Sequence, residues 1–396
     1  MTEQSGPIRQ RMTAKRVRTR SELAEFIDLA PRLAAQRDET DHYVPLFTSD
    51  IAAWFHRRGW FTDPIELWLL VDDDGRARAR TICHQSSQLA AELSDSGPRS
   101  TLFFGAIEAE APDDLEQLIE FITTRALEVS ADRVFGPVSP LPNVTGGLLL
   151  SGTDHPGFFD TAWNPDFYAR VFREAGFSTW GPAQTWEVEV GGIPAPRATA
   201  VTEAEWAHHG LRRRRVSRWR IGAFRRRLLP TLNSSFKALP YYTQIRPAQL
   251  RAQMQGLAAL ADPDLIIDIA GSGDPDDAPP RCFALVIPDP LPILRRHRGH
   301  LGAGAAVDLL TQRGRLRDAV LIIQGTDPAF QGQGLLSLAI RDLNANLVAH
   351  GYRRLRVTFI AEDNPASAAV FERCGGRPLH ELAFLDRHLT TEARGR

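Results

Sequence analysis

The sequence has few of the features that direct a protein to a membrane, an oxidising compartment or a nucleic acid. Its three cysteines, Cys83, Cys282 and Cys374, lie far apart and give neither a disulfide framework nor a CxxC metal motif, which suits a reducing cytoplasm. The longest apolar runs, such as FALVIP and AVLII, are much shorter than the roughly 20 residues of a membrane helix. The formal net charge is only -1, so no global attraction to nucleic acid is expected. We therefore expect a cytoplasmic protein without a membrane partner.

The composition is that of a folded protein. Of the 396 residues, 43% are hydrophobic and 24% are charged, which excludes a wholly disordered or fibrous chain. At about 150 residues per domain, this length predicts two or three domains. The Gly/Pro-rich stretch GGIPAP at 191–196 is the best candidate for a boundary. We therefore predict a flexible tail over residues 1–14, one domain over 15–192 and a second domain over 193–396.

The two predicted domains repeat one order of secondary-structure elements. In the first domain, a helix at 111–128 precedes the last of the strands expected at 67–71, 77–83, 102–107 and 134–137. In the second domain, a helix that ends near residue 350 precedes the last of the strands expected at 265–269, 282–287, 319–324 and 355–360. A further helix, a glycine and a final strand follow in both. The pattern predicts an internal duplication of one α/β fold.

A glycine-rich loop in the second domain is the strongest functional signal. The apolar strand at 319–324 leads to Gln331, Gly332, Gln333 and Gly334, after which a helical pattern begins. Glycine lets the main chain approach a ligand without a Cβ clash, and the start of a helix offers free N–H groups to an anion. The loop therefore predicts a cradle for a diphosphate, with a tight strand-to-helix turn as the structural alternative.

Two motifs and several longer stretches resemble the GNAT acyltransferase superfamily. The loop resembles its Q/R-x-x-G-x-G/A acyl-CoA motif, and EDNPASAAVFERCGG at 362–376 resembles its N-x-x-A-x-x-x-Y-x-x-x-G-F motif. Over roughly residues 16–390, the chain also resembles a group of tandem GNAT proteins, in the stretches FIDLAPRL, HYVPLF, LFFGAIEAE, FGPVSPLPNVTGGLLL, WNPDFYARVFREAGF, FALVIPDP and FIAEDNP. The resemblance implies an α/β fold of two tandem GNAT-like domains, each with a mixed, mostly antiparallel sheet flanked by helices.

The resemblance also implies an activity for the second domain. That domain would bind acetyl-CoA or another acyl-CoA as co-substrate and transfer the acyl group to an amine of a small molecule. The implied cofactor-binding residues are Ile323, Gln324, Gln331, Gly332, Gln333, Gly334, Leu335 and Asn364. Asn364 could equally cap the helix that begins at the next residue.

Several positions depart from the family pattern. Leu336 replaces a small residue at the end of the loop motif, Phe371 replaces the tyrosine that often protonates the departing thiolate, and Gly376 replaces the final phenylalanine. The first domain has no glycine-rich loop after its third strand, and Asp113 and Asp114 stand where the phosphate would bind. We therefore expect CoA to bind only to the second domain.

The expected reaction needs a group that removes a proton from the acceptor, because an alkylammonium has a pKa near ~10.4. A carboxylate, or a water that it polarises, can do this. The candidate catalytic residues are Asp289, Asp327 and Asn364, with Asp318, Glu362 and Asp363 as further candidates. Each carboxylate has a structural alternative, as a solvated or helix-capping group, and Asp327 before Pro328 favours an Asx-turn. A backbone N–H at 323–325 would meet the oxyanion.

The first domain is expected to shape the acceptor pocket. The tandem resemblance and the need for a proton donor in place of Phe371 give the candidate substrate-binding residues Asn143, Trp163, Asn164, Tyr168, Tyr241 and Tyr242. Turn formation and core packing are the structural alternatives for these residue types.

Arginine supplies nearly all of the positive charge, since Lys15 and Lys237 are the only lysines. Residues 211–230 contain nine arginines and no acid. Their apolar residues recur at helical spacing, which predicts a basic amphipathic helix. It could be a solvated face, flank the CoA 3′-phosphate or hold tRNA. An aminoacyl-tRNA-dependent transferase is therefore one alternative function. A GNAT scaffold that has lost acyl transfer and acts in a biosynthetic pathway is the other. No metal site is expected, because the close histidine pairs lack further ligands at metal spacing.

Overall fold

The computed structural model describes residues 11–94, 99–217, 221–237, 243–257 and 260–389. Its first half contains β1 (Thr13–Arg16), α1 (Arg20–Gln36), α2 (Thr48–Phe55), β2 (Ile65–Val71), β3 (Ala77–His84), α3 (Ser87–Glu92), β4 (Thr101–Ala109), α4 (Pro112–Glu128), β5 (Arg133–Gly136), β6 (Leu148–Ser151), α5 (Phe167–Glu174) and β7 (Ser178–Glu189). Its second half contains α6 (Glu203–His208), β8 (Leu211–Arg213), α7 (Ile221–Phe236), α8 (Pro247–Leu257), β9 (Ile266–Gly271), β10 (Cys282–Pro288), α9 (Leu291–Arg296), α10 (Ala303–Gln312), β11 (Asp318–Thr326), α11 (Leu335–Ala349), β12 (Arg354–Ala361), α12 (Pro365–Glu372) and β13 (Arg377–His388).

The described strands form one continuous sheet. Twelve of them follow the order β1-β2-β3-β4-β5-β13-β7-β12-β11-β10-β9-β8, and β6 pairs with β13. The pairs β4–β5 and β11–β12 are parallel, one in each half, and the other pairs are antiparallel. The sheet is therefore mixed and mostly antiparallel, with helices against it, and the expected tandem α/β fold class is confirmed.

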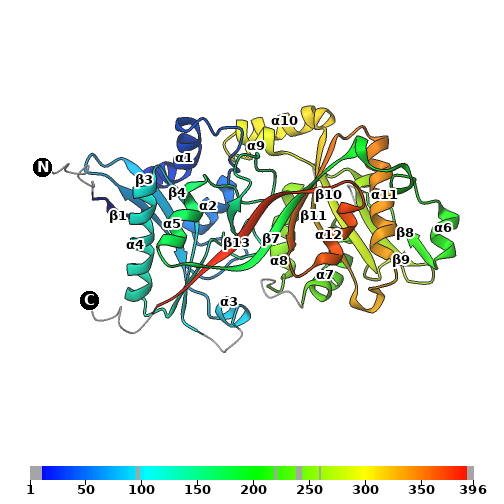
Figure 1. The fold of residues 1–396 in the computed structure, drawn as a ribbon, viewed down its shortest axis with the longest axis horizontal. Helices are drawn as coiled ribbons and strands as arrows, with labels where there is room; N and C mark the ends of the chain where they lie inside the picture. The colour runs from blue at the N-terminus through cyan, green and yellow to red at the C-terminus, as the bar shows by residue number, and fades with distance from the viewer. Residues whose placement is uncertain (1–10, 95–98, 218–220, 238–242, 258–259, 390–396) are drawn as a thin grey trace, which may run out of the picture.

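The last strand of each half lies against the other half. β13 pairs with β5 from Leu385↔Gly136 to His388↔Arg133, and β7 pairs with β12 from Arg354↔Glu189 to Ala361↔Ala183. Figure 1 shows β13, in red, running beside β7 from the second half into the first. The sheet therefore passes without a break through the boundary predicted at 192/193, and that boundary remains a prediction about the sequence.

Amphipathic helices fix the core on both sides of this junction. α4 connects the parallel strands β4 and β5, and α11 connects the parallel strands β11 and β12. Each helix places an apolar face on the sheet. The buried positions are Leu115, Leu118, Ile119 and Ile122 in α4, and Leu335, Ala339, Ile340, Leu343 and Leu347 in α11. In the part of the chain that the structure describes, no helix is both long and apolar enough to cross a membrane.

The sequence predicts one basic helix over the arginine-rich stretch at 211–230, but the structure shows that this stretch begins with a strand. Residues Leu211–Arg213 form β8 at the edge of the sheet, and the described part of α7 runs from Ile221 to Phe236. Four of these arginines meet carboxylates: Arg212 with Asp276, Arg213 with Asp342, and both Arg214 and Arg227 with Asp268, at 2.8, 2.7, 2.6 and 2.7 Å. Pairing with β9 takes precedence over helix propensity here, and much of the local positive charge is already balanced.

Candidate functional site

The parallel strands β11 and β12 separate in the middle of the second half. They pair from Asp318↔Arg354 to Leu321↔Val357, and the pairing stops there. Thr358 donates its hydroxyl to the carbonyl oxygens of Leu321 and Ile322, at 3.3 and 3.0 Å. On its other edge β11 stays paired with β10 as far as Thr326. The main chain after Leu321 therefore has one free edge, which faces the gap between the two strands.

The glycine-rich loop closes one end of this gap. Gly332 and Gly334 have φ angles of 75° and 77°, in the left-handed region that favours glycine. A Cβ at either position would meet nothing within 4 Å, so the space in front of both is open. Gly334 is the N-cap of α11 and provides no side-chain cap, which leaves the first N–H groups of a 15-residue helix available to an anion.

The gap and the loop open into a cavity of about 1110 Å³. Of the predicted cofactor residues, those that line it are Ile323, Gln324, Gln331, Gly332, Gly334, Leu335 and Asn364. Gln333 lies outside the lining and donates its amide to the carbonyl oxygen of Ala329 at 3.4 Å. The Oε1 atom of Gln324 is buried without a hydrogen-bond partner among the described residues, so it is available to a donor on a ligand.

Both halves build the remaining walls, which are largely apolar. α7 and α8 contribute side chains such as Leu232 and Met254, and the first half contributes Trp54, Trp60 and Phe159. Cavities of this size with a few polar groups are typical of small-molecule sites.

The predicted catalytic residues lie apart from one another. Asp289 is 4% exposed, does not line this cavity and accepts a hydrogen bond from the N–H of Leu291 at 2.9 Å. Its neighbour in the sheet is Asp318 at the start of β11, whereas Asp327 follows the end of that nine-residue strand. At about 3.3 Å per residue, the two carboxylates are therefore roughly a full strand length apart and cannot act on one substrate atom.

Asp327 and Asn364 have local structural roles. Asp327 accepts from the N–H of Ala329 at 2.9 Å, which is the Asx-turn that the following proline favours. Asn364 caps α12 by accepting from the N–H of Ser367 at 3.3 Å, and it also lines the cavity. Only Asn364 of the three predicted catalytic residues is thus in contact with the cavity.

Three of the four predicted substrate residues that the structure describes lie outside the cavity. Asn143 lines it and accepts a hydrogen bond from the hydroxyl of Thr243 at 3.1 Å, which links the two halves. Trp163 donates to the carbonyl oxygen of His155. Asn164 bonds both main-chain groups of Leu149.

Tyr168 is buried at 1% exposure, and its hydroxyl accepts from the N–H of Ala109 at 2.6 Å. Like Trp163 and Asn164, it has the packing and turn role that was the alternative for these residue types. Tyr241 and Tyr242 lie outside the described residues.

Asp160 is an acidic residue of the cavity that the sequence does not indicate. It follows Phe159 in a loop of the first half and has a φ of 64°. Desolvation raises the pKa of its carboxyl to about 7, and no other cause acts on it. Asp50, in the first turn of α2, also lines the cavity, and desolvation raises the pKa of its carboxyl as well. Nothing in the sequence distinguishes Asp160 from the other loop aspartates, because its role depends on where the fold places it.

Phe371 belongs to the core of the second half. Its side chain is 0% exposed and packs in the same cluster as Val357 and Leu335. Leu336 lines the cavity next to the loop. A phenylalanine ring can neither donate nor accept a proton, so it cannot replace the family's tyrosine chemically.

The corresponding gap in the first half is closed by the chain itself. β4 and β5 pair from Thr101↔Arg133 to Phe103↔Phe135 and then also diverge. Residues 138–139 fill the opening: the N–H of Val138 donates to Phe104 O at 2.8 Å, and the Ser139 hydroxyl accepts from Ala106 N–H at 3.3 Å.

At the adjacent start of α4, two acids lie in the first turn, and Asp114 pairs with Arg78 at 3.3 Å. That this half binds no CoA stays a prediction, which the filled gap and the two acids favour.

One group of possible metal ligands occurs in the described part of the chain. It consists of Asp262, Asp264 and His350 near the surface, and no ion is present. Exposed acidic groups of this kind are common without a metal, and none of these three residues lines the cavity.

No family model matches the chain, and no curated protein matches it. Among solved structures, a tandem GNAT protein from the clavulanic acid biosynthesis pathway has a TM-score of 0.57 at 12% identity, with 96% of this chain and 98% of that chain covered. A GCN5-related N-acetyltransferase from Sphaerobacter thermophilus has a TM-score of 0.51 at 11% identity, with 96% of each chain covered.

A third similar structure is a GCN5-related glucosamine N-acetyltransferase region of a fungal multi-domain GH3 beta-N-acetylglucosaminidase. Its TM-score is 0.54 at 11% identity, and this chain, 96% of which is covered, spans 38% of its length. The structures that the fold resembles are therefore GNAT proteins. The chain has the tandem GNAT fold.

Proposed function

We propose that the second half of the protein is an N-acyltransferase that uses an acyl-CoA, most simply acetyl-CoA, and acylates an amine of a small molecule. The observation that carries this proposal is the loop at 331–334. Its two left-handed glycines open onto the helix N-terminus, the free edge of β11 and the cavity together. A tight turn without a ligand would not need that space to stay open.

The chain's own groups divide the binding of the co-substrate among them. The N–H groups at the start of α11 hold the diphosphate. The free edge of β11 at Ile323 and Gly325 offers main-chain groups to the amide-containing arm, in place of the strand pairing that ends at Leu321. When bound, an acyl-CoA supplies the thioester whose acyl group is transferred. A main-chain N–H at the same edge can stabilise the developing oxyanion.

The acceptor occupies the side of the cavity built by both halves. Its largely apolar walls fit an amine that carries an apolar body. Asp160 is the carboxylate that we assign as general base, since it faces this space and its pKa of about 7 suits proton transfer near neutral pH. With Phe371 buried, the thiolate leaves without a phenol donor at that position, which the acidity of the CoA thiol permits.

Calorimetry with acetyl-CoA tests the binding part of the proposal. Gly334→Asp should abolish binding, because it places a carboxylate at the phosphate cradle and strains a φ of 77°. Gly75→Asp is the matched control: Gly75 has the same φ of 77° and the same open space, but it lies in a hairpin turn of the first half. Unchanged binding in Gly334→Asp would refute the cradle.

Turnover with acetyl-CoA and a panel of apolar primary amines tests the transfer. Release of free CoA that depends on the amine supports it. The second candidate function, a GNAT scaffold without acyl transfer, is favoured by the buried Phe371 and predicts tight acetyl-CoA binding with no turnover for any amine.

A further inference from the structure

A second cavity, of about 820 Å³, lies at the junction of the two halves, away from the glycine-rich loop. The second half contributes α9, the segment before β11, and the starts of β11, β12 and β13, while the first half contributes the end of β7 and residues 40–41 and 155–157. Leu291 of α9 also lines the first cavity, so this helix forms part of the wall between them. None of the glycine-rich loop contributes to this second cavity.

The lining is strongly charged, and positive charge predominates. Among the described residues it contains seven arginines, Arg295, Arg296, Arg315, Arg317, Arg354, Arg356 and Arg377, and four carboxylates, Asp41, Glu187, Asp289 and Asp318. Arg296 is engaged by Asp308, outside the lining, at 3.3 Å. Six arginines therefore face four carboxylates, which leaves an excess of two positive charges in a confined space between the halves.

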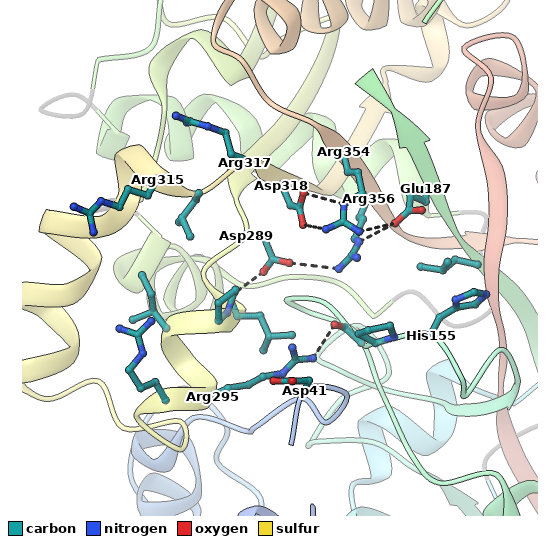
Figure 2. A pocket seen from close by; sticks show the side chains of 18 of the residues that line it. Asp41, His155, Glu187, Asp289, Arg295, Arg315, Arg317, Asp318, Arg354 and Arg356 are labelled. Carbon is teal, nitrogen blue, oxygen red and sulfur yellow. Dashed lines mark hydrogen bonds and ion pairs between the residues drawn. The ribbon is translucent and has the colours of Figure 1, made fainter. Parts of the chain in front are cut away.

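The innermost part of the cavity is a network of fixed ion pairs. Figure 2 shows the guanidinium of Arg356 directed at Glu187 and Asp289, with distances of 3.2 and 4.0 Å. Arg354 binds Asp318 through two nitrogens, at 3.0 and 2.7 Å. Arg356, Glu187 and Asp289 are all less than 9% exposed. Their partners hold these side chains in place, so the wall of the cavity is already ordered before any ligand arrives.

Three arginines of the lining have no carboxylate within ion-pair distance among the described residues: Arg295, Arg315 and Arg317. Arg295 donates to the carbonyl oxygens of Tyr43, His42 and Gly157, at 2.8, 2.9 and 3.0 Å, which fixes it against the first half but leaves its charge unbalanced.

Arg315 and Arg317 are exposed at the rim of the cavity. Figure 2 shows both on the side of Asp289 that lies away from Glu187. Arg317 donates to the carbonyl oxygen of Gly314 at 3.0 Å, and the planar guanidinium of each suits bidentate contact with an oxyanion.

We propose that this cavity binds a small dianion whose charge is carried by oxyanion groups, either a phosphate monoester or a dicarboxylate. Two negative charges balance the excess of two arginines, and carboxylate and phosphate oxygens are the acceptors that guanidinium groups bind best. The site is formed by both halves, so the bound dianion would tie the first half to α9 of the second. It does not depend on the proposed acyl transfer.

Calorimetry at constant ionic strength, with chloride as the background anion, tests the site with two probes: inorganic phosphate and succinate. Saturable binding of either probe is expected. Phosphate alone would identify the phosphate class, succinate alone the dicarboxylate class, and both a general oxyanion site. No saturable binding of either would overturn the proposal.

Three variants make the test specific. Arg315→Gln combined with Arg317→Gln should weaken probe binding by about tenfold or more, and because both side chains are exposed the variant should fold normally. Asp41→Asn should strengthen binding severalfold, since it removes a negative charge from the lining. Arg170→Gln, on the exposed face of α5, is the matched control and should change nothing. Equal affinity in the double variant and the control would also overturn the site.

Discussion

The two halves treat the same structural opportunity in opposite ways. In each, a parallel strand pair diverges after a few residues and a helix starts nearby. In the first half, residues 138–139 bond to the free edge of β4, whereas in the second half the free edge of β11 faces a cavity. A GNAT fold alone therefore does not define a CoA site. What matters is whether the chain satisfies the freed main-chain groups itself or leaves them for a ligand.

The helix starts differ in the same sense. α4 begins with a proline and then Asp113 and Asp114, so its N-terminus carries its own anions. α11 begins after Gly334 with no acid in its first turn. In the first half the helix N-terminus is thus stabilised by the chain's own carboxylates, and this half contributes a wall and the side chain of Asp160 to the cavity of the second half.

The largest expected effect comes from the glycine that permits the closed gap. A Cβ on Gly105 would lie 1.8 Å from the carbonyl oxygen of Val138, so Gly105→Ala must push main chain apart and should cost about 3 kcal/mol or more of unfolding free energy. Gly325→Ala, in the open gap, meets the ring of Phe283 at 2.9 Å and should cost less, because a ring edge can shift. Urea unfolding of both variants measures the difference, and equal losses would contradict the closed-versus-open comparison.

The next largest effect concerns Asp160, the residue of the first half that we propose as general base. Asp160→Asn keeps the shape and tolerates the positive φ, but it removes the base, so kcat/KM should fall by about 10²–10⁴ at pH 8. In the wild type, activity should rise with pH through a pKa of about 7, as the carboxylate forms.

Stability gives a second readout for Asp160. A pKa raised from its usual value in the folded state means that the fold loses stability as the pH rises through 4 to 7, so Asp160→Asn should unfold at a higher temperature than the wild type at pH 8 and not at pH 3.5. An unchanged pH–rate profile in this variant would remove Asp160 from the mechanism.

A smaller effect is expected for two buried histidines, His84 in the first half and His380 in the second half. His84 packs between Phe61 and Phe103, and burial lowers its pKa to about 3. The protein therefore loses stability as the pH falls from about 6.5 toward 3, because His84 binds a proton more readily in the unfolded chain than in the folded one. His84→Phe should remove about 1–3 kcal/mol of the loss between pH 7 and pH 4.5, as measured by urea unfolding.

His380 is the comparison for this prediction. Its pKa is lowered to about 4, and its ring is hydrogen-bonded to the Thr185 hydroxyl at 2.7 Å. His380→Phe removes the ring's hydrogen bonds to the Thr185 hydroxyl and to the carbonyl oxygen of His155, so it should lower stability at neutral pH, which His84→Phe should not. The opposite ranking at pH 7 would contradict the assignment.

The smallest expected effect is none. Asp113→Asn combined with Asp114→Asn removes the repelling charges from α4, yet acetyl-CoA should still bind with one site per chain, because residues 138–139 continue to fill the gap. A second calorimetric site in this variant would show that charge, and not closure, keeps the first half empty.

The sequence allows much of this architecture to be predicted, because local patterns carry it. The glycines at 332 and 334 before an apolar helical repeat indicate the open loop, and alternating strands with helices between them indicate two α/β units. The exchange of strands, in which the last strand of each half pairs with the other half, could not be predicted, because β13 and its partner β5 are far apart in the sequence.

Side-chain roles were harder to predict for the same reason. Asn164 and Tyr168 have residue types that serve equally in a site or in a core, and only their bonds to Leu149 and Ala109 distinguish the two. Asp160 is the reverse case: an unremarked loop residue whose surroundings give it an unusual pKa.

The exchange of β13 and β7 has a consequence for biosynthesis. β5 emerges from the ribosome early, but its neighbour β13 is translated about 250 residues later, which at 5–20 residues per second takes roughly 12–50 seconds. During that interval the edge of the nascent first half exposes unpaired main chain, which is a template for wrong pairing between chains on neighbouring ribosomes. Slow codons or chaperone contact in this window should therefore affect the yield of folded protein more than the same changes near the stop codon.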